Sequence, residues 1–199
     1  MLFDEENLVA AARAGDFRRM LEPQAQLTEA IRNNESLREG EPRAVLGQLT
    51  ELTSRLLNVA RAGVWALDEE LTKLTCVDLF YATEGRHGSG TVISRADAPA
   101  YFKLLFEGSV LAANDARTDT RTDELARTYL PAFGVGALLD CPILIDRRVA
   151  GVLRAEHVGE ARRWEGWERL LGSSIAACAG VAVEVARSSA AARWRRLAG

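Results

Sequence analysis

Residues 134–159 read GVGALLDCPILIDRRVAGVLRAEHVG, and this stretch determines how the rest of the chain is arranged. It contains two apolar runs rich in branched side chains, residues 137–145 and 149–158, separated only by Asp146-Arg147-Arg148. Two such runs around a short polar segment are typical of a β-hairpin. Pro142 has no amide hydrogen, so we expect it at a bulge or on the side of its strand that has no partner. The hairpin is predicted to form the middle of a sheet.

Amphipathic helices are predicted on both sides of this hairpin in the sequence. Residues 4–38 and 43–61 carry apolar side chains at helical spacing, which places them on one face of each helix. Gly15-Asp16 is expected to stop and restart the first helix, and Pro23 is expected to kink or end it. Residues 164–197 are predicted to form one long helix after the hairpin.

The segment between these helices and the hairpin is predicted to contain short strands and short helices. A first hairpin is expected from residues 63–68 and 74–81, which flank a short polar turn. The other expected elements are a loop at 82–89, a strand at 91–94, a helix opened by Asp97 and closed by Gly108, a strand at 109–113, a polar loop at 114–122 and a helix at 123–133. This order predicts an α+β fold with an antiparallel sheet of about six strands. Terminal helices should cover one face, and short helices and loops should form a cavity on the other.

Length and composition predict a single soluble domain. The chain has 199 residues, is 48% hydrophobic and carries a net charge of −3, so it can bury a core and has no general attraction for nucleic acid. We find no apolar stretch of the roughly 20 residues that a membrane span needs, and the acidic start is unlike a signal peptide. Cys76, Cys141 and Cys178 are too scattered for a framework, so buried free thiols in a cytoplasmic protein are expected. A longer parent protein could still be tethered to a membrane.

Short motifs along the chain occur in the order that one known family shows. The motifs are Val64-Trp65-Ala66-Leu67-Asp68, Arg86-His87-Gly88-Ser89-Gly90, Asp97-Ala98-Pro99-Ala100-Tyr101-Phe102, Asp115-Ala116-Arg117-Thr118-Asp119, Tyr129-Leu130, Leu138-Leu139-Asp140-Cys141-Pro142-Ile143, Gly151-Val152-Leu153, Glu156-His157-Val158-Gly159 and Arg162-Arg163-Trp164. Over roughly residues 25–186 the chain resembles a GAF domain. The resemblance is to the type found N-terminal in bacterial sensor histidine kinases and diguanylate cyclases.

The resemblance implies a non-catalytic sensory domain that binds a small molecule or a partner. It divides the chain into an N-terminal helical extension (1–40), the GAF domain (41–186) and a C-terminal signalling helix (187–199). The signal would pass through the terminal helices to a kinase or cyclase module outside this chain. Because GAF modules commonly pair through such helices, we also expect a parallel homodimer built on a four-helix bundle.

Residues expected to line or border the cavity follow from the aromatic side chains, the polar loops and the resemblance. Tyr81, Tyr101, Phe102, Phe106, Tyr129 and Phe133 suit a flat organic ligand and suit a plain core equally well. The segment around His87 and Arg86 could cradle an anion or form an ordinary loop. The full set of candidates is Tyr81, His87, Tyr101, Phe102, Asp115, Arg117, Asp119, Arg121, Tyr129, Cys141, Glu156 and His157.

The candidates do not combine into a metal or catalytic motif. Glu156-His157 supplies too few ligands for a metal and lacks H-E-x-x-H spacing, so a structural or pocket-wall role is predicted. Asp115, Asp119 and Asp123 lack the spacing of an EF-hand. Salt bridges with neighbouring arginines, and helix capping by Asp123 or Thr122, are expected instead.

Two alternative functions remain open at this point. One is a structural dimerisation module with no ligand. The other is a thiol-dependent enzyme of the methionine-sulfoxide-reductase type that would use Cys141. A bilin-binding Cys-His motif after an Asp-Pro-like turn is absent. Arg154-Ala155 takes the place of the Cys-His that the family usually has before Glu-His, which argues against metal or thiol chemistry at that position. The sequence names no cofactor.

Overall fold

The computed structural model of the chain describes residues 14–32 and 42–198. In chain order its elements are α2 (Ala14–Arg32), α4 (Pro42–Leu57), β1 (Arg61–Leu67), β2 (Lys73–Tyr81), β3 (Arg86–Gly88), β4 (Val92–Ser94), α5 (Pro99–Phe106), β5 (Leu111–Ala113), the 3-10 turn η1 (Thr120–Thr122), α6 (Asp123–Thr128), α7 (Leu130–Phe133), β6 (Val135–Ile145), β7 (Arg148–Val158) and α8 (Gly166–Ala198). None of the described helices is both long enough and apolar enough to cross a membrane.

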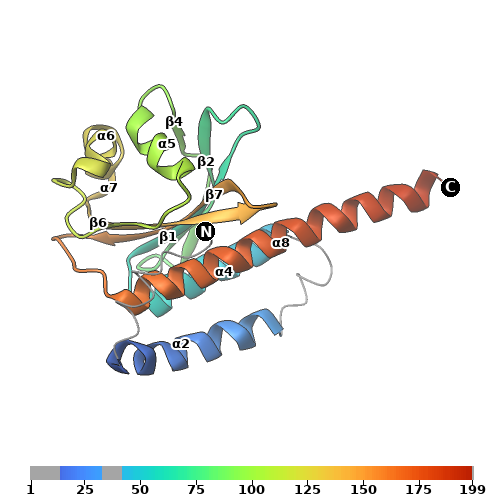
Figure 1. The fold of residues 1–199 in the computed structure, drawn as a ribbon, viewed down its shortest axis with the longest axis horizontal. Helices are drawn as coiled ribbons and strands as arrows, with labels where there is room; N and C mark the ends of the chain where they lie inside the picture. Colours follow the sequence, from blue (N-terminus) through green and yellow to red (C-terminus); the bar gives the residue numbers. More distant parts are fainter. Residues whose placement is uncertain (1–13, 33–41, 199) are drawn as a thin grey trace.

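The strands form one antiparallel sheet between two layers of helices. The order is β3-β2-β1-β7-β6-β5, and β4 pairs with β2 away from this path. Helices α2, α4 and α8 lie on one side of the sheet, whereas α5, α6 and α7 lie on the other (Figure 1). The predicted α+β architecture is therefore confirmed, with seven strands where about six were expected. The additional strand is β3, within the segment predicted as a loop.

The central hairpin forms as predicted. Asp146 and Arg147 join β6 to β7 and both have positive φ, 49° and 64°, which matches the twist of the strands they connect. On its other side β7 pairs with β1, so the hairpin lies in the middle of the sheet. The pairing of β5 with β6 ends at Asp140, so Pro142 lies where β7 alone is paired with β6.

Small residues let α8 lie directly against β6. A Cβ atom at Gly172 would be 2.7 Å from Sγ of Cys141, and one at Gly180 would be 2.6 Å from the carbonyl oxygen of Leu144. Ala176 has no exposed surface. The helix therefore follows the sheet at close range, and its C-terminal part continues past the sheet edge (Figure 1).

Two predicted helix boundaries are wrong. Helix α2 begins at Ala14 and continues past Pro23, so the boundary expected near this proline is absent; contacts with α8 and the burial of Leu27 hold the helix in place. The stop and restart expected at Gly15-Asp16 stays a prediction, because the residues before Ala14 lie outside the described ones. Helix α4 ends at Leu57, well before residue 61. Asn58 adopts a left-handed φ of 48°, which asparagine tolerates well and which closes the helix. Residues 4–13 and 33–38 of the first predicted helix lie outside the described residues.

The start of α5 also differs from the prediction. Asp97 does not cap it, since its carboxylate accepts a hydrogen bond from Ser94 Oγ at 2.6 Å. The free backbone amides of Ala100 and Tyr101 donate instead to the carboxylate of Glu124, at 3.2 and 2.9 Å. Glu124 belongs to α6, so this cap joins the two helices over the sheet.

Candidate functional site

The candidate site is the face of the sheet beneath α5, α6 and α7. Successive residues of a strand point to opposite faces. In the central hairpin, Asp140, Arg154 and Glu156 point to this face, whereas Cys141 and Ala155 belong to the core cluster on the helix side. We call the charged and phenolic side chains gathered here the pocket-face network. They are Arg61, Tyr101, Tyr129, Asp140, Arg154 and Glu156.

One half of the pocket-face network is centred on Arg154. This residue faces Asp140 across the hairpin, and its guanidinium donates to both carboxylate oxygens, from Nε to Oδ1 at 2.8 Å and from Nη2 to Oδ2 at 2.7 Å. The hydroxyl of Tyr101 donates to Asp140 Oδ2 at 2.6 Å and accepts from Arg154 Nη2 at 2.8 Å. Cζ of Arg154 lies 5.1 Å from the Trp65 ring centre. Arg154 has no exposed surface, and Asp140 is 2% exposed.

The other half is centred on Glu156. Its Oε1 accepts a hydrogen bond from the Tyr129 hydroxyl at 2.6 Å, and its Oε2 lies 2.9 Å from Arg61 Nε. Arg61 Nη2 in turn donates to the Tyr129 hydroxyl at 2.9 Å. The Arg61 guanidinium also lies over the Phe133 ring, 4.1 Å from its centre, a cation–π contact. Each buried charge therefore has an opposite charge beside it.

Burial and the neighbouring charges determine how these groups titrate. Burial, reinforced by the adjacent carboxylates, raises the pKa of both Tyr101 and Tyr129, so both phenols remain protonated donors. Burial opposes the charge of Arg154, but Asp140 outweighs it and the pKa of the guanidinium is well above its usual value. Burial also raises the pKa of Glu156, although Arg61 and Arg154 favour its ionised form.

Side chains fill most of the space that the sequence predicted as a cavity. A cavity of about 10 Å³ remains beside Tyr101, Leu105, Asp140 and Val152, enough for about one water molecule. Around Arg154 the predicted cavity is occupied by Tyr101 and Asp140 of the pocket-face network and by Trp65, which are at most 2% exposed here. Arg154 Nη1 and Trp65 Nε1 are buried without a hydrogen-bond acceptor.

The structure brings together only some of the predicted site residues. Tyr81, Tyr101, Phe102, Tyr129 and Glu156 lie on the pocket face. Cys141 lies on the opposite face under α8, where burial raises the pKa of its thiol. His157 follows Glu156 in the strand and therefore points away from it. Glu156 and His157 cannot act as a pair.

His87 also lies away from the pocket face. Its Nδ1 is 3.0 Å from Asp78 Oδ2, and its Nε2 is 3.1 Å from Glu51 Oε1, so it links β3 to α4. Thr50 Oγ1 donates to the same Asp78 oxygen, and the Phe80 ring packs beside the imidazole. Burial alone would lower the pKa of His87, but Asp78 and Glu51 outweigh it and the net shift is upward.

This upward pKa shift predicts a pH-dependent contribution to stability. It is fully present below the unfolded-state pKa of about 6.5 and is lost as the pH rises through the higher folded-state pKa. The free energy of unfolding of the wild type should exceed that of His87→Gln by up to about 1 kcal/mol more at about pH 5.5 than at about pH 8. The value is small because solvent screens the interaction of His87 with Asp78 and Glu51. Urea denaturation of both proteins at the two pH values measures this. A difference that does not change with pH would contradict it.

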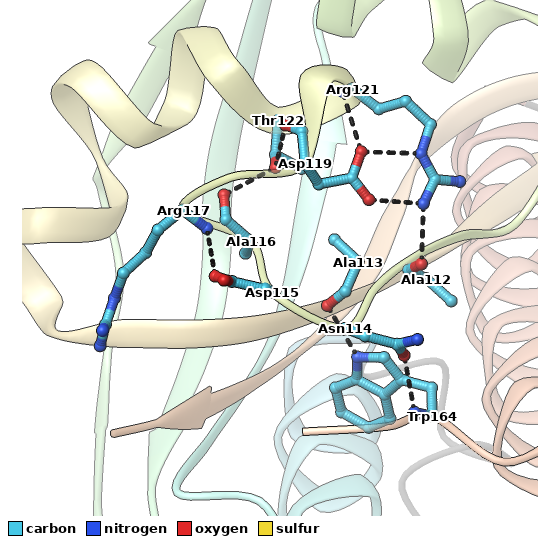
Figure 2. Close-up of polar contacts among 10 residues, drawn as sticks. All are labelled: Ala112, Ala113, Asn114, Asp115, Ala116, Arg117, Asp119, Arg121, Thr122 and Trp164. Atoms are coloured by element: carbon cyan, nitrogen blue, oxygen red, sulfur yellow. Dashed lines mark hydrogen bonds and ion pairs between the residues drawn. The ribbon is translucent and has the colours of Figure 1, made fainter. Parts of the chain in front are cut away.

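The charged side chains of the polar loop before α6 bond to one another and to backbone groups in and beside the loop (Figure 2). The Asp119 carboxylate accepts from the backbone amide and the guanidinium of Arg121, with Nη2 at 2.6 Å. These bonds lower the pKa of Asp119 and make it the cap of η1. Asp115 accepts from the backbone amide of Arg117, whose guanidinium donates to the Gly159 carbonyl. Within residues 14–32 and 42–198, no three His, Cys, Asp or Glu side chains are grouped to hold a metal ion.

The predicted salt bridges of this loop are present, but the predicted caps are not. Arg121 pairs with Asp119, and Arg127 pairs with Asp123. Thr122 precedes α6 without capping it, because its hydroxyl donates to the Ala116 carbonyl at 2.7 Å (Figure 2).

Comparison with protein families finds a match to the model described as GAF domain, over residues 41–183. The chain belongs to the GAF domain family. GAF domains are generally sensory or regulatory. A search of curated protein sequences finds no match.

Solved GAF structures share this fold. The PixJ GAF domain of Thermosynechococcus elongatus, in its blue-light absorbing form, is 22% identical, with a TM-score of 0.63 over 82% of this chain and 95% of that one. A domain of a two-component sensor histidine kinase protein from Sinorhizobium meliloti 1021 is 18% identical, with a TM-score of 0.58 over 75% and 96%. The GAF domain of an Acinetobacter phosphoenolpyruvate-protein phosphotransferase is 13% identical, with a TM-score of 0.66 over 86% and 96%. At these identities the likeness establishes the fold alone.

Proposed function

We propose that this chain is a non-catalytic sensory or regulatory GAF domain of the cytoplasm. Binding of a small molecule or a partner at the pocket face alters the pocket-face network. The change passes through the terminal helices to an output module outside this chain, a histidine kinase or a diguanylate cyclase. Residues 41–186 receive the signal in this proposal, residues 187–199 carry it onward, and residues 1–40 form a helical extension.

The observation that carries the proposal is the continuity between the pocket face and α8. Residues of the pocket-face network lie on β1, β6 and β7, and α8 packs against β6 and β7 from the other side. Helix α8 is uninterrupted for 33 residues. A packed helix transmits a shift at one end as a displacement of the other, so a ligand that binds two sheet conformations unequally also biases the helix.

The ligand class follows from the unpaired donors. Arg154 Nη1 and Trp65 Nε1 lack an acceptor, and the surrounding wall is aromatic. A planar organic molecule bearing a carboxylate or carbonyl oxygen fits this chemistry. Asp115, Arg117, Asp119 and Arg121 would border its entrance, as the resemblance implies. Entry requires α5 to move, because Tyr101 now fills the space.

Thermal-shift screening with small carboxylates and carbonyl compounds tests this function, followed by native mass spectrometry of any compound that stabilises the protein. A ligand at 100 times its Kd adds about 2.7 kcal/mol, or roughly 5–10 °C for a domain of this size. Tyr101→Phe removes one hydroxyl and should weaken the response. Turnover of any compound by the purified protein would contradict the proposal.

The thiol-enzyme alternative has little support from the cysteine environments. The reactive form of cysteine is the thiolate. Burial raises the pKa of Cys76 to about 12 and that of Cys141 further, so neither supplies a thiolate near neutral pH. We therefore do not retain the reductase proposal.

A structural dimerisation module is the second candidate, and the filled pocket face favours it. In that case the network is a permanent core, and no compound should stabilise the protein. Both candidates include a parallel homodimer through a four-helix bundle of the terminal helices, which should bury at least about 1,000 Å². Exposed Leu21 and Val181 are on these helices. Light scattering that gives a monomer at high concentration would reject the dimer.

A further inference from the structure

Arg162, in the segment between β7 and α8, contacts α4 and α8, the two helices that pack against the sheet strands. Its Nη1 donates to the carbonyl oxygens of Leu57 at 2.8 Å and Asn58 at 3.1 Å, where α4 ends. Its Nη2 pairs with Glu168 in the first turn of α8. One guanidinium therefore binds the end of α4 and the start of α8 together.

The charges at this junction are complementary. The last carbonyls of a helix carry partial negative charge, which a guanidinium stabilises. Glu168 is 3% exposed, and its Oε2 accepts from the backbone amide of Glu165 at 2.8 Å, as in a capping box. Its other oxygen is the partner of Arg162. If Arg162 is removed, the α4 carbonyls lose a donor and a buried carboxylate loses its counter-charge.

The same junction is fixed to the loop on the pocket side. The backbone amide of Arg162 donates to the Asn114 carbonyl at 2.8 Å. Trp164 follows, with its backbone amide bonded to Asn114 Oδ1 at 2.8 Å and its indole N–H bonded to the Ala113 carbonyl at 3.2 Å (Figure 2). The Arg162 guanidinium lies over the Trp164 ring, 4.5 Å from its centre. Asn114 immediately follows β5.

Strands β1, β5 and β7, which carry or adjoin the pocket-face network, are each connected by a short segment to a group that Arg162 binds or to Arg162 itself. Arg61 begins β1, just after Asn58. Asp140 pairs with Leu111 of β5, and the chain leaves β5 at Asn114. Glu156 lies near the end of β7, from which the chain continues to Arg162. A change in the spacing of these strands therefore changes the positions of the groups that Arg162 binds.

We infer that Arg162 is the positioning residue that couples the pocket face to α4 and α8. The inference deepens the sensory function proposed above and rests on it. A single planar guanidinium holds the α4 carbonyls and Glu168 at fixed relative positions, so the two helices shift together when β1 or β5 moves. Arg162 thus couples the pocket face to the two helices. This coupling is a free energy that can be measured separately from the stability of the fold.

Hydrogen-exchange mass spectrometry of the whole chain tests this without a ligand. Tyr129→Phe perturbs the network by removing the hydroxyl between Arg61 and Glu156. In the wild-type background it should change amide exchange of residues 166–172 by about threefold or more, within the range that such coupling carries. In the Arg162→Met background the same perturbation should change this exchange by less than about 1.5-fold. Exchange of β7 should respond in both backgrounds.

Two further variants separate coupling from structural support. Arg162→Lys keeps the positive charge at the end of α4. The compact ammonium of lysine cannot bind the α4 carbonyls and Glu168 at the same time, as the two Nη atoms of Arg162 do. This variant should fold, and Tyr129→Phe should no longer change the exchange of residues 166–172 in it. It therefore tests the role of Arg162 even if Arg162→Met does not fold. Arg163→Met is the matched control, because the Arg163 side chain is 81% exposed, and the response should remain intact.

Each outcome supports or rejects a distinct statement. A response at residues 166–172 that is equal in the wild-type and Arg162→Met or Arg162→Lys backgrounds would show that coupling does not run through Arg162, and the sensory function would stand. A wild-type background with no response to Tyr129→Phe at these residues would reject the relay itself, and the role of Arg162 with it. If Arg163→Met also abolishes the effect of Tyr129→Phe on residues 166–172, the coupling is not specific to Arg162 and the inference is rejected.

Discussion

Replacing Asp140 with alanine is expected to lower the free energy of unfolding by about 3–5 kcal/mol, because the change leaves a fully buried guanidinium without its counter-charge. Asp140 is the carboxylate that Arg154 contacts through two hydrogen bonds, and it also accepts from Tyr101. Urea denaturation of the variant and the wild type measures the loss.

A double replacement provides the control for this prediction. Asp140→Leu with Arg154→Met removes both charges and keeps apolar bulk, so it should recover most of the stability that the single variant loses. Tyr101→Phe removes only the shared hydroxyl and should cost about 1–2 kcal/mol. If Asp140→Ala costs less than about 1 kcal/mol, Arg154 must reach solvent or another acceptor, and our description of a closed pocket face would be wrong.

Enlarging the two glycines of α8 that face β6 is expected to lift this helix from the sheet. Valine at Gly172 would meet Sγ of Cys141, and valine at Gly180 would meet the Leu144 backbone. Each replacement should cost about 1–3 kcal/mol from overpacking, and the costs should be roughly additive because the contacts are about two turns apart. Thermal and urea unfolding of the single and double variants measure these values.

Ala177→Val is the matched control, because it adds the same side chain on the exposed side of the same helix. It should change stability by no more than about 0.5 kcal/mol. The two glycine variants should also increase hydrogen exchange along the sheet-facing part of α8. If they are as stable as Ala177→Val, the helix must tolerate displacement from β6, and the close contact has no energetic role.

The central hairpin could be predicted because its information is local. Two apolar runs and a short polar turn specify two paired strands, and the helices on either side have clear apolar faces. Boundaries that depend on other parts of the chain could not be predicted in this way. Pro23 remains inside a helix because α2 packs on α8, and Glu124 caps α5 from a separate helix.

The candidate site was harder to predict because both faces of the sheet are covered. The strands are apolar on both sides, so the pattern of polar and apolar residues does not show which of them face α4 and α8 and which face the pocket. Counting back from the turn, where Ile145 pairs with Arg148, would place Leu153 opposite Asp140. A register shift between Ile143 and Leu144 places Arg154 there instead. Pro142 indicated a bulge or an unpaired side of the strand but did not show which residues would face each other, and so Asp140 and Arg154 were not predicted.

Strand geometry alone separates neighbouring residues of the central hairpin. Cys141 directly follows Asp140, and His157 directly follows Glu156, so at most one residue of each pair can face a given side of the sheet. The pairing of Arg61 with Glu156 could not be foreseen, since it depends on β1 lying beside β7, far away in the sequence.

The length of α8 has a mechanical consequence. A straight helix of 33 residues is about 50 Å long, so it acts as a lever. A tilt of about 5° around its first turn would move the far end by about 4 Å, most of the 5.4 Å pitch of a helical turn. A small rearrangement at the pocket face could therefore displace the C-terminal end of α8 by several ångströms.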